Sequence, residues 1–391
     1  MERFVFPRLL PRLALVTGLA LAGPLYAADG LTVLHAFNTT DGLSPAGRLV
    51  QSPDGAFYGT TTYGGLNDFG EVFRVDASGD FSILYSFPKT GGVNPQGALV
   101  LMDDGFFYGT TPNLNYCRDT PRGPFCKTLG SGTVFRVGAD GTFATVHVFK
   151  NLRTHQFIDP LTDGGDGLLY GMTAVGGPET YGFAYAISTD GIYMPLADFH
   201  QATGGRPYGG LTRGTDGNFY GTASDGGAHG DGTVFRMSPD GTMTTLYSFT
   251  GGADGRWPRT TLLQGSDGRL YGGAGTTVFA ITTGGELTVL HTFDNPDTPG
   301  VIEKLVEGAD GYLYGTSIDS DYPLGGLYRM SKDGQQFEVL HQFTAQEGTQ
   351  PSSGPIFGSD GRLYGTTWTS GNGSAGTVYA FDLTALRKAK P

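Results

Sequence analysis

The sequence predicts an all-β fold: a seven-bladed β-propeller with four-stranded antiparallel blades, closed into a ring by the N-terminal strand, which completes the last blade. Three observations predict it. A repeat of about fifty residues recurs seven times along the chain. Each repeat carries its own turn signals, and the two ends of the chain hold complementary parts of one repeat. Repetition at this period indicates one repeat architecture and not several unrelated domains.

Three landmarks define the repeat. The first is an Asp-Gly-x-(Phe/Leu)-Tyr-Gly signature, the second a Gly-Thr-Val-Phe-Arg-like strand, and the third a Leu-x-x-Phe-like strand. The tyrosines of the first are Tyr58, Tyr108, Tyr170, Tyr220, Tyr271, Tyr314 and Tyr364. The aromatic residues of the second are Phe73, Phe135, Tyr185, Phe235, Phe279, Tyr328 and Tyr379. Those of the third are Phe37, Phe87, Phe149, Phe199, Phe249, Phe293 and Phe343.

The intervals between landmarks show where the repeat is rigid. From the third landmark to the next tyrosine is 21 residues in every case but one, which has 22. From the second to the third is 14 residues, with one case of 15. The interval from the tyrosine to the second landmark is usually 15 but ranges from 8 to 27. One loop of each repeat therefore carries most of the insertions and deletions.

Each repeat is predicted to hold four short strands, which we call A, B, C and D. In the second repeat they are Ala98–Met102, Phe106–Thr111, Thr133–Val137 and Thr145–Phe149. Asp-Gly pairs separate A from B and C from D, and such pairs favour tight hairpin turns because glycine adopts positive φ without a steric cost. A four-stranded meander of this period is the unit of a propeller blade.

The chain ends support a closed ring. After its N-terminal segment the chain opens with a lone D-type strand, Leu31–Phe37, and it finishes with a C-type strand, Val378–Asp382. Pairing these two strands completes a seventh blade and removes two exposed strand edges.

The N-terminal segment has the layout of a secretory signal. Arginines precede and flank an apolar run at Leu13–Leu21, and small residues follow at Ala27 and Ala28. This pattern predicts a signal peptide over residues 1–27 and an exported protein of the periplasm or the cell exterior. The rest of the chain is expected to be one propeller domain over residues 28–383 and a short basic tail over residues 384–391.

Composition and charge restrict the partners. Glycine is abundant at 66 residues and charged residues are few at 16%, which suits short strands joined by tight turns. The formal charge is −12, and residues 1–27 hold three Arg and one Glu, so the mature chain would carry −14. An acidic surface repels phosphates, so we expect no nucleic acid partner. We also expect no transmembrane span in the mature chain, and a monomer.

The repeat units resemble a bacterial family. Tyr58-Gly59-Thr60-Thr61, followed by Gly64-Gly65, is similar to the repeats of the choice-of-anchor tandem repeat proteins called GloVer-containing. So are Gly232-Thr233-Val234-Phe235-Arg236 and Leu246-Tyr247-Ser248-Phe249. The resemblance covers essentially all of residues 31–383. It implies an exported, often surface-associated bacterial protein in a family without an assigned activity.

Candidate ligand residues lie in the loops between strands B and C and between strand D and the next strand A. In a propeller these two kinds of loop open onto one face, and length variation there is how repeat scaffolds present binding loops. Aromatic and polar residues of these loops suit stacking on sugars or contact with a protein. The candidates are Trp257, Trp368, Arg206, Tyr208, Arg259, Asp159, Glu303 and Lys304. Packing between blades and ordinary loop polarity are the alternative interpretations.

The histidines fall into two groups. Four of them, His35, His147, His291 and His341, occupy a strand-D position that holds Tyr85 or Tyr247 in other repeats. Exchange with tyrosine predicts a packing or edge role for that position, and not metal ligation. The other three, His155, His200 and His229, are the weak metal candidates because they could converge on the variable face. We predict no metal site and no cofactor, with a divalent cation as the alternative.

The only two cysteines, Cys117 and Cys126, lie within the longest B–C interval. In an oxidising compartment a disulfide bond is expected, and closing so short a loop would stabilise the fold by about 2.5–3 kcal/mol.

The sequence favours a non-catalytic binding or interaction propeller of the bacterial envelope or exterior, with a glycan or a protein as its ligand. The sequence contains no phosphate-binding loop, no dinucleotide-binding fingerprint and no nucleophile elbow. The alternatives are an extracytoplasmic propeller enzyme, such as a polysaccharide or small-molecule lyase or hydrolase, and a structural surface repeat protein. Fold alone does not separate these functions.

Overall fold

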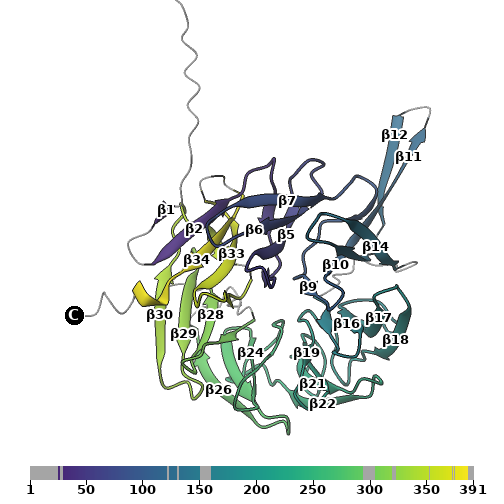
Figure 1. The fold of residues 1–391 in the computed structure, drawn as a ribbon. Coiled ribbons are helices and arrows are strands. Elements are labelled where there is room, and N and C mark those ends of the chain that lie inside the picture. The colour runs from purple at the N-terminus through teal and green to yellow at the C-terminus, as the bar shows by residue number, and fades with distance from the viewer. Residues whose placement is uncertain are drawn as a thin grey trace, which may run out of the picture.

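The computed structural model describes residues 30–120, 123–129, 132–149, 160–293, 304–318, 323–351, 353–371, 373 and 375–385, together with strand 25–26. For 25–26 and for 113–129 only the backbone is described. The described strands form seven blades arranged in a ring around a central axis, as the sequence predicts (Figure 1).

Each blade has a short innermost strand A followed outward by strands B, C and D. Blade one holds β4 (Val50–Gln51), β5 (Phe57–Tyr63), β6 (Glu71–Val75) and β7 (Phe81–Ser86), and blade two holds β9 (Val100–Leu101), β10 (Phe107–Thr111), β13 (Thr133–Val137) and β14 (Phe143–Val148). Blade three holds β15 (Thr162–Asp163), β16 (Leu168–Thr173), β17 (Phe183–Ser188) and β18 (Tyr193–Asp198). Blade four holds β19 (Thr212–Arg213), β20 (Phe219–Ala223), β21 (Thr233–Met237) and β22 (Met243–Ser248).

Blade five holds β23 (Leu263–Gln264), β24 (Leu270–Ala274), β25 (Thr277–Ile281) and β26 (Leu287–Thr292). Blade six holds β27 (Val306–Glu307), β28 (Leu313–Ser317), β29 (Gly326–Met330) and β30 (Phe337–Gln342). Blade seven holds β32 (Ile356–Phe357), β33 (Leu363–Thr369), β34 (Thr377–Phe381) and β2 (Leu31–Ala36). Three short strands add to the edges of blades one and seven: β3 (Leu43–Pro45), β31 (Thr349–Pro351) and β1 (Leu25–Tyr26).

The ring closes through the N-terminal strand. Strand β2 pairs antiparallel with β34, with Leu31 opposite Phe381 and Ala36 opposite Thr377. Figure 1 shows the purple β2 beside the yellow β34. Blade seven is therefore built from both ends of the chain, which confirms the predicted closure.

The repeated tyrosine of strand B holds the turn that precedes it. In blade six the Tyr314 hydroxyl donates a hydrogen bond to Asp310, 2.7 Å away, at the Asp-Gly turn. Five other blades repeat this bond at 2.6–2.8 Å, through Tyr108, Tyr170, Tyr220, Tyr271 and Tyr364. The tyrosine rings are buried between neighbouring blades: the ring centroids of Tyr58 and Phe107 lie 4.1 Å apart. One residue thus fixes both the turn and the packing of blade on blade.

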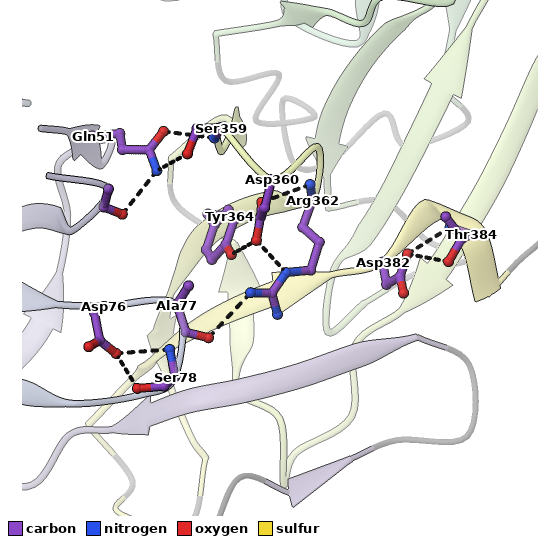
Figure 2. A network of polar contacts seen from close by, with 11 residues as sticks. Gln51, Asp76, Ala77, Ser78, Ser359, Asp360, Arg362, Tyr364, Asp382 and Thr384 are labelled. Atoms are coloured by element: carbon purple, nitrogen blue, oxygen red, sulfur yellow. Dashed lines mark hydrogen bonds and ion pairs between the residues drawn. The ribbon is translucent and has the colours of Figure 1, made fainter. Parts of the chain in front are cut away.

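Polar contacts join neighbouring blades, and the closing joint between blades seven and one has them too. The Ser359 amide donates to Gln51 Oε1 at 2.9 Å, and Arg362 Nη2 donates to the Ala77 carbonyl at 3.2 Å (Figure 2). The equivalent contacts between blades five and six are Ser266 to Glu307 and Arg269 to Lys332. Because the closing joint repeats the contacts of an internal joint, the closure is a regular part of the ring.

The strand-D histidines pack against rings of the next blade. His35 stacks on Phe81 with ring centroids 3.6 Å apart and planes 2° from parallel. Tyr85, at the equivalent position, stacks on Phe143 at 3.7 Å. The predicted packing role of this position is confirmed for His35.

The long B–C interval of blade two forms a separate small sheet. Strands β11 (Asn113–Thr120) and β12 (Gly123–Leu129) pair as a hairpin, and β11 also pairs with β8 (Gly91–Val93). The hairpin projects beyond the ring (Figure 1). The backbone register sets Cys117 directly opposite Cys126. The side chains of both cysteines lie outside the described residues, so their disulfide stays a prediction.

Within the part of the chain that the structure describes, no helix has the length and apolar character needed to span a membrane.

Candidate ligand-binding site

Five loops between strand D of one blade and strand A of the next share an unusual backbone conformation. Each has a non-glycine residue with positive φ, between 51° and 59°, directly before a proline. These residues are Ser44, Asn94, Arg206, Trp257 and Gln350. A residue before proline normally adopts an extended conformation, and a positive φ costs about 1–3 kcal/mol outside glycine. Contacts around each loop must therefore hold it in place.

A hydrogen bond to the B–C loop of the preceding blade, whose strand D the loop follows, provides that contact. The Trp257 amide donates to the Asp231 carbonyl at 2.8 Å, and the other four residues make the equivalent bond at 2.8–2.9 Å. The carbonyl always precedes a glycine that packs on the proline ring: a Cβ on Gly232 would lie 2.6 Å from Pro258 Cδ. The D–A and B–C loops of these blades are therefore packed together on one face, with a shared frame and different side chains.

This frame directs alternate side chains into the central channel. After the proline the chain extends toward strand A, so residues two and four positions beyond the positive-φ residue face the same way. Arg48 of blade one is the fourth residue after its positive-φ residue, and Tyr208 of blade four and Arg259 of blade five are each the second residue after theirs. These side chains line a cavity of about 480 Å³, to which all seven blades contribute. That volume falls in the range of small-molecule pockets, about 300–1,000 Å³. We call it the channel pocket.

Two partly buried cations stand beside blade seven in the channel pocket. Arg48, from blade one, donates from Nη2 to the carbonyl of Pro355 at 2.9 Å, and its buried Nε has no hydrogen-bond partner among the described residues. Lys304 lies in the equivalent position of blade six. Burial, and then the positive charge of Arg48, lower the pKa of Lys304 to about 7. Burial also lowers the pKa of Arg48, to about 10.

On the opposite side of the channel pocket an aromatic ring meets a third cation. The Arg259 guanidinium carbon lies 4.9 Å from the centroid of the Tyr208 ring. Tyr208, Arg259 and Lys304, three of the eight residues singled out in the sequence, thus line one cavity.

Three other candidates lie outside the channel pocket. Arg206 pairs with Asp225 of the B–C loop at 3.2 Å. Trp257 is 41% exposed, and Arg256 lies over its ring at 4.2 Å. Trp368 is partly buried near the end of β33. None of the three is a lining residue of the channel pocket.

The remaining candidates include residues outside the described part of the chain. Asp159, Glu303 and His155 fall there. His200 contacts Glu179 at 3.1 Å, and His229 is exposed. Among the described residues no group of three or more His, Cys, Asp or Glu side chains is arranged to hold a metal ion.

The chemistry of the channel pocket is cationic and aromatic. Its described lining residues include Arg48, Arg259, Lys304 and Tyr208, but no His, Cys, Asp or Glu. Such an arrangement can donate hydrogen bonds and stack on a flat ligand face.

Arg48 is the charged lining residue, among those described, that sequence reasoning missed. A signal for it exists, because Arg48-Leu49-Val50-Gln51 aligns with Lys304-Leu305-Val306-Glu307 at the start of strand A. Comparison of equivalent positions between blades would have paired the two cations.

Solved structures share this fold over most of the chain. Virginiamycin B lyase from Staphylococcus aureus is 16% identical, with a TM-score of 0.62 over 89% of this chain and 98% of that chain. Oligogalacturonate lyase from Vibrio parahaemolyticus is 12% identical, with a TM-score of 0.57 over 90% of this chain and 93% of the other. The extracellular domain of a hybrid two-component system from B. thetaiotaomicron is 10% identical, with a TM-score of 0.57 over 88% of this chain and 39% of that one. At these identities the likeness establishes the fold alone.

No curated protein matches the sequence. A repeat family does, and its matches to residues 22–118, 124–276 and 273–388 span nearly the whole propeller. The repeat that builds the blades is the repeat that defines this family, and the chain therefore belongs to the Gloeobacter/Verrucomicrobia repeat family.

Proposed function

We propose that this chain is an exported binding propeller that takes a glycan or protein ligand on the face of the D–A and B–C loops, at the channel pocket. One observation carries the proposal. The loops hold one backbone frame in five blades, yet the side chains that line the channel pocket differ in type from blade to blade. A scaffold that needed those positions only for packing would favour one residue type, whereas recognition of an asymmetric ligand needs several.

The kinds of side chain support a ligand with both polar and apolar faces. Tyr208 offers an aromatic ring, with Arg259 over it, and the amide of Gln96 and the hydroxyl of Ser353 also line the channel pocket. A few polar groups beside an aromatic surface are typical of small-ligand sites. Trp257, which is 41% exposed in the D–A loop that leads to Arg259, would extend the contact for a larger ligand.

A glycan array probed with the purified chain tests this function. We expect a ligand whose affinity falls at least tenfold in Tyr208→Ala. Tyr63→Ala is the matched control, because Tyr63 is 45% exposed but lies outside the channel pocket. Parallel arrays with and without EDTA test the divalent-cation alternative. Binding that Tyr208→Ala leaves intact would move the site away from the channel pocket.

An extracytoplasmic enzyme is the second candidate, and one observation favours it. With a pKa lowered to about 7 by burial, Lys304 would be suited to act as a general base near neutral pH. Two of the similar structures are named as lyases. Mass spectrometry of array ligands after overnight incubation tests this function. Product formed by the wild type and not by Lys304→Met would favour the enzyme over the binding protein.

Export is proposed on the N-terminal segment alone, whose residues 1–24 and 27–29 lie outside the described part of the chain. Cleavage after Ala27 would remove β1, which pairs with β2 on the outer edge of blade seven. N-terminal sequencing of the protein from a periplasmic or culture fraction tests it, and Ala28 is the expected first residue.

A further inference from the structure

The channel pocket is cationic in a chain that is strongly acidic. Asp and Glu outnumber Lys and Arg by 37 to 25, and the formal net charge is −12. The described lining nevertheless includes three cations, Arg48, Arg259 and Lys304, and no carboxylate. The local charge of the channel pocket is therefore opposite in sign to that of the whole chain.

Elsewhere in the ring several partly buried cations have carboxylate partners. Arg329 meets Glu338 at 2.6 Å, and Lys332 meets Glu307 at 2.5 Å. Within the described residues Arg48 and Lys304 form no ion pair. A partly buried cation without a counter-charge is unfavourable because its lost hydration is not replaced. Arg48 and Lys304 therefore lack the carboxylate counter-charge that Arg329 and Lys332 have.

The backbone holds these two cations in place. Arg48 is anchored to blade seven by its hydrogen bond to Pro355. Lys304 is packed against the same blade from the other side: a Cβ on Gly354 would lie 1.7 Å from the Lys304 carbonyl. Blade seven lies between them, and they are close enough for the charge of Arg48 to lower the pKa of Lys304. Natural proteins retain such unfavourable arrangements chiefly where function requires them.

We propose that the channel pocket binds the compact oxyanion group, carboxylate or sulfate, of a small ligand between Arg48 and Lys304. The inference rests on the proposed function in taking the channel pocket as the ligand site, and it adds the chemical class of the ligand. The guanidinium presents several donors in a planar fork that matches the oxygens of such a group, and the ammonium adds a flexible point charge. Tyr208 and Arg259, across the cavity, are placed to contact the remainder of the ligand.

Sodium sulfate is the first probe. The melting temperature of the wild type is measured across 0–50 mM sodium sulfate, with sodium chloride at equal ionic strength as the reference. We expect sulfate to raise it by several degrees beyond chloride, because a ligand that binds the folded state stabilises it. Lys304→Met should lose that extra rise, and it should melt higher than the wild type without sulfate because it removes the repulsion with Arg48.

Arg213→Gln is the matched control. It removes one positive charge from an exposed position of blade four outside the channel pocket, and it should keep the full sulfate response. Lys304→Gln is a second variant in case the methionine disturbs folding. An equal sulfate response in the wild type and in both Lys304 variants would overturn the proposal.

Glucuronate and glucose distinguish a carboxylate ligand from a bare inorganic anion. In calorimetry at pH 6 we expect glucuronate to bind at least tenfold more tightly than glucose, and this preference to disappear in Lys304→Met. At pH 9 the preference should shrink, because Lys304, whose pKa is lowered to about 7, loses its proton while Arg48, with a pKa of about 10, keeps its own. Arg259 is the other charged group of the described lining. A sulfate response without a glucuronate preference would restrict the site to sulfate-like groups and support the oxyanion site itself.

The two proposals fail in different ways. A neutral glycan whose binding depends on Tyr208 and is unchanged by Lys304→Met would leave the proposed function standing and overturn the oxyanion inference. A Lys304-dependent sulfate response, with no glycan or protein ligand found, would support the inference and count against the proposed function.

Discussion

The guanidinium of Arg48 donates a hydrogen bond from Nη2 to the main-chain carbonyl of Pro355, 2.9 Å away. These two residues are 307 positions apart in the sequence, and they belong to the first and the last blade. The bond crosses the closing joint between blades seven and one, so ring closure and the channel pocket share one contact. A change that opens the ring should therefore disturb the site as well.

Deletion of residues 31–37 tests the closure. It removes strand β2, whose partner β34 would become an exposed edge, and it removes three core side chains, those of Leu31, Leu34 and Phe37. Each buried apolar side chain contributes about 1.5–3 kcal/mol, so we expect aggregation or a fall in melting temperature of about 10 °C or more. Light scattering and thermal melts measure it. Replacement of the β11–β12 hairpin by a short turn, which deletes more residues outside the ring, should keep a monomer of near-normal stability.

Cys117 and Cys126 are predicted to form a disulfide bond in protein that passes through an oxidising compartment. Their backbones are directly opposite in the β11–β12 hairpin, which suits a short cross-link. Mass spectrometry without reduction should find no free thiol and one intramolecular bridge. The double replacement by Ser should lower stability by no more than about 3 kcal/mol, because the hairpin lies outside the ring. Two alkylatable thiols in folded exported protein would contradict the prediction.

The sequence predicts the blades because their signals are local. The Asp-Gly turn, the tyrosine that bonds back to it and the period of the repeat all lie within one unit, as Asp310 and Tyr314 illustrate. The site is harder to predict because it is assembled across the ring. Arg48, Arg259 and Lys304 come from blades one, five and six, and their convergence follows only from the closed arrangement.

The tryptophans show a second limit of sequence reasoning, because conspicuous loop residues need not line the site. Trp257 and Trp368 are the most conspicuous loop residues, yet neither lines the channel pocket. Trp257 occupies the positive-φ position before Pro258, and the channel-facing positions are the second and fourth after it. Which residue of a loop faces inward depends on its backbone conformation, and neither composition nor spacing contains that information.

Tyr328 and Tyr314 form a matched pair in blade six with opposite expected effects. The Tyr328 hydroxyl is buried without a hydrogen-bond partner among the described residues, at a position that is Phe in four other blades. Burial raises its pKa. Tyr328→Phe should therefore raise the free energy of unfolding by about 1 kcal/mol, because an unsatisfied buried hydroxyl costs about 1–3 kcal/mol.

Tyr314→Phe should lower the free energy of unfolding by about 1 kcal/mol instead, because it removes the hydrogen bond to Asp310. Urea unfolding of the two variants and the wild type, with m-values compared, measures both effects. If both variants changed stability in the same direction, hydrogen bonding would not be the cause.

Glu71 is a buried carboxyl where several other blades have threonine at the start of strand C, as at Thr133, Thr233 and Thr377. Its Oε1 accepts hydrogen bonds from Ser86 Oγ at 2.7 Å and from the Leu66 amide at 3.2 Å. Its Oε2 has no partner among the described residues. Burial outweighs the two hydrogen bonds and raises the pKa of Glu71 above its usual value.

The raised pKa makes stability depend on pH in a defined direction. A carboxyl whose pKa is higher in the folded state than in the unfolded state takes up a proton on folding. Its contribution is complete below the unfolded pKa, about 4.3, and is lost as pH rises through the folded pKa. Glu71→Gln cannot titrate, so the stability of the wild type relative to this variant should be greatest near pH 4 and should decline toward pH 8. Paired chemical unfolding of the two proteins at several pH values measures this difference. A difference that stays constant, or that grows with pH, would show that Glu71 is ionised in the fold without cost.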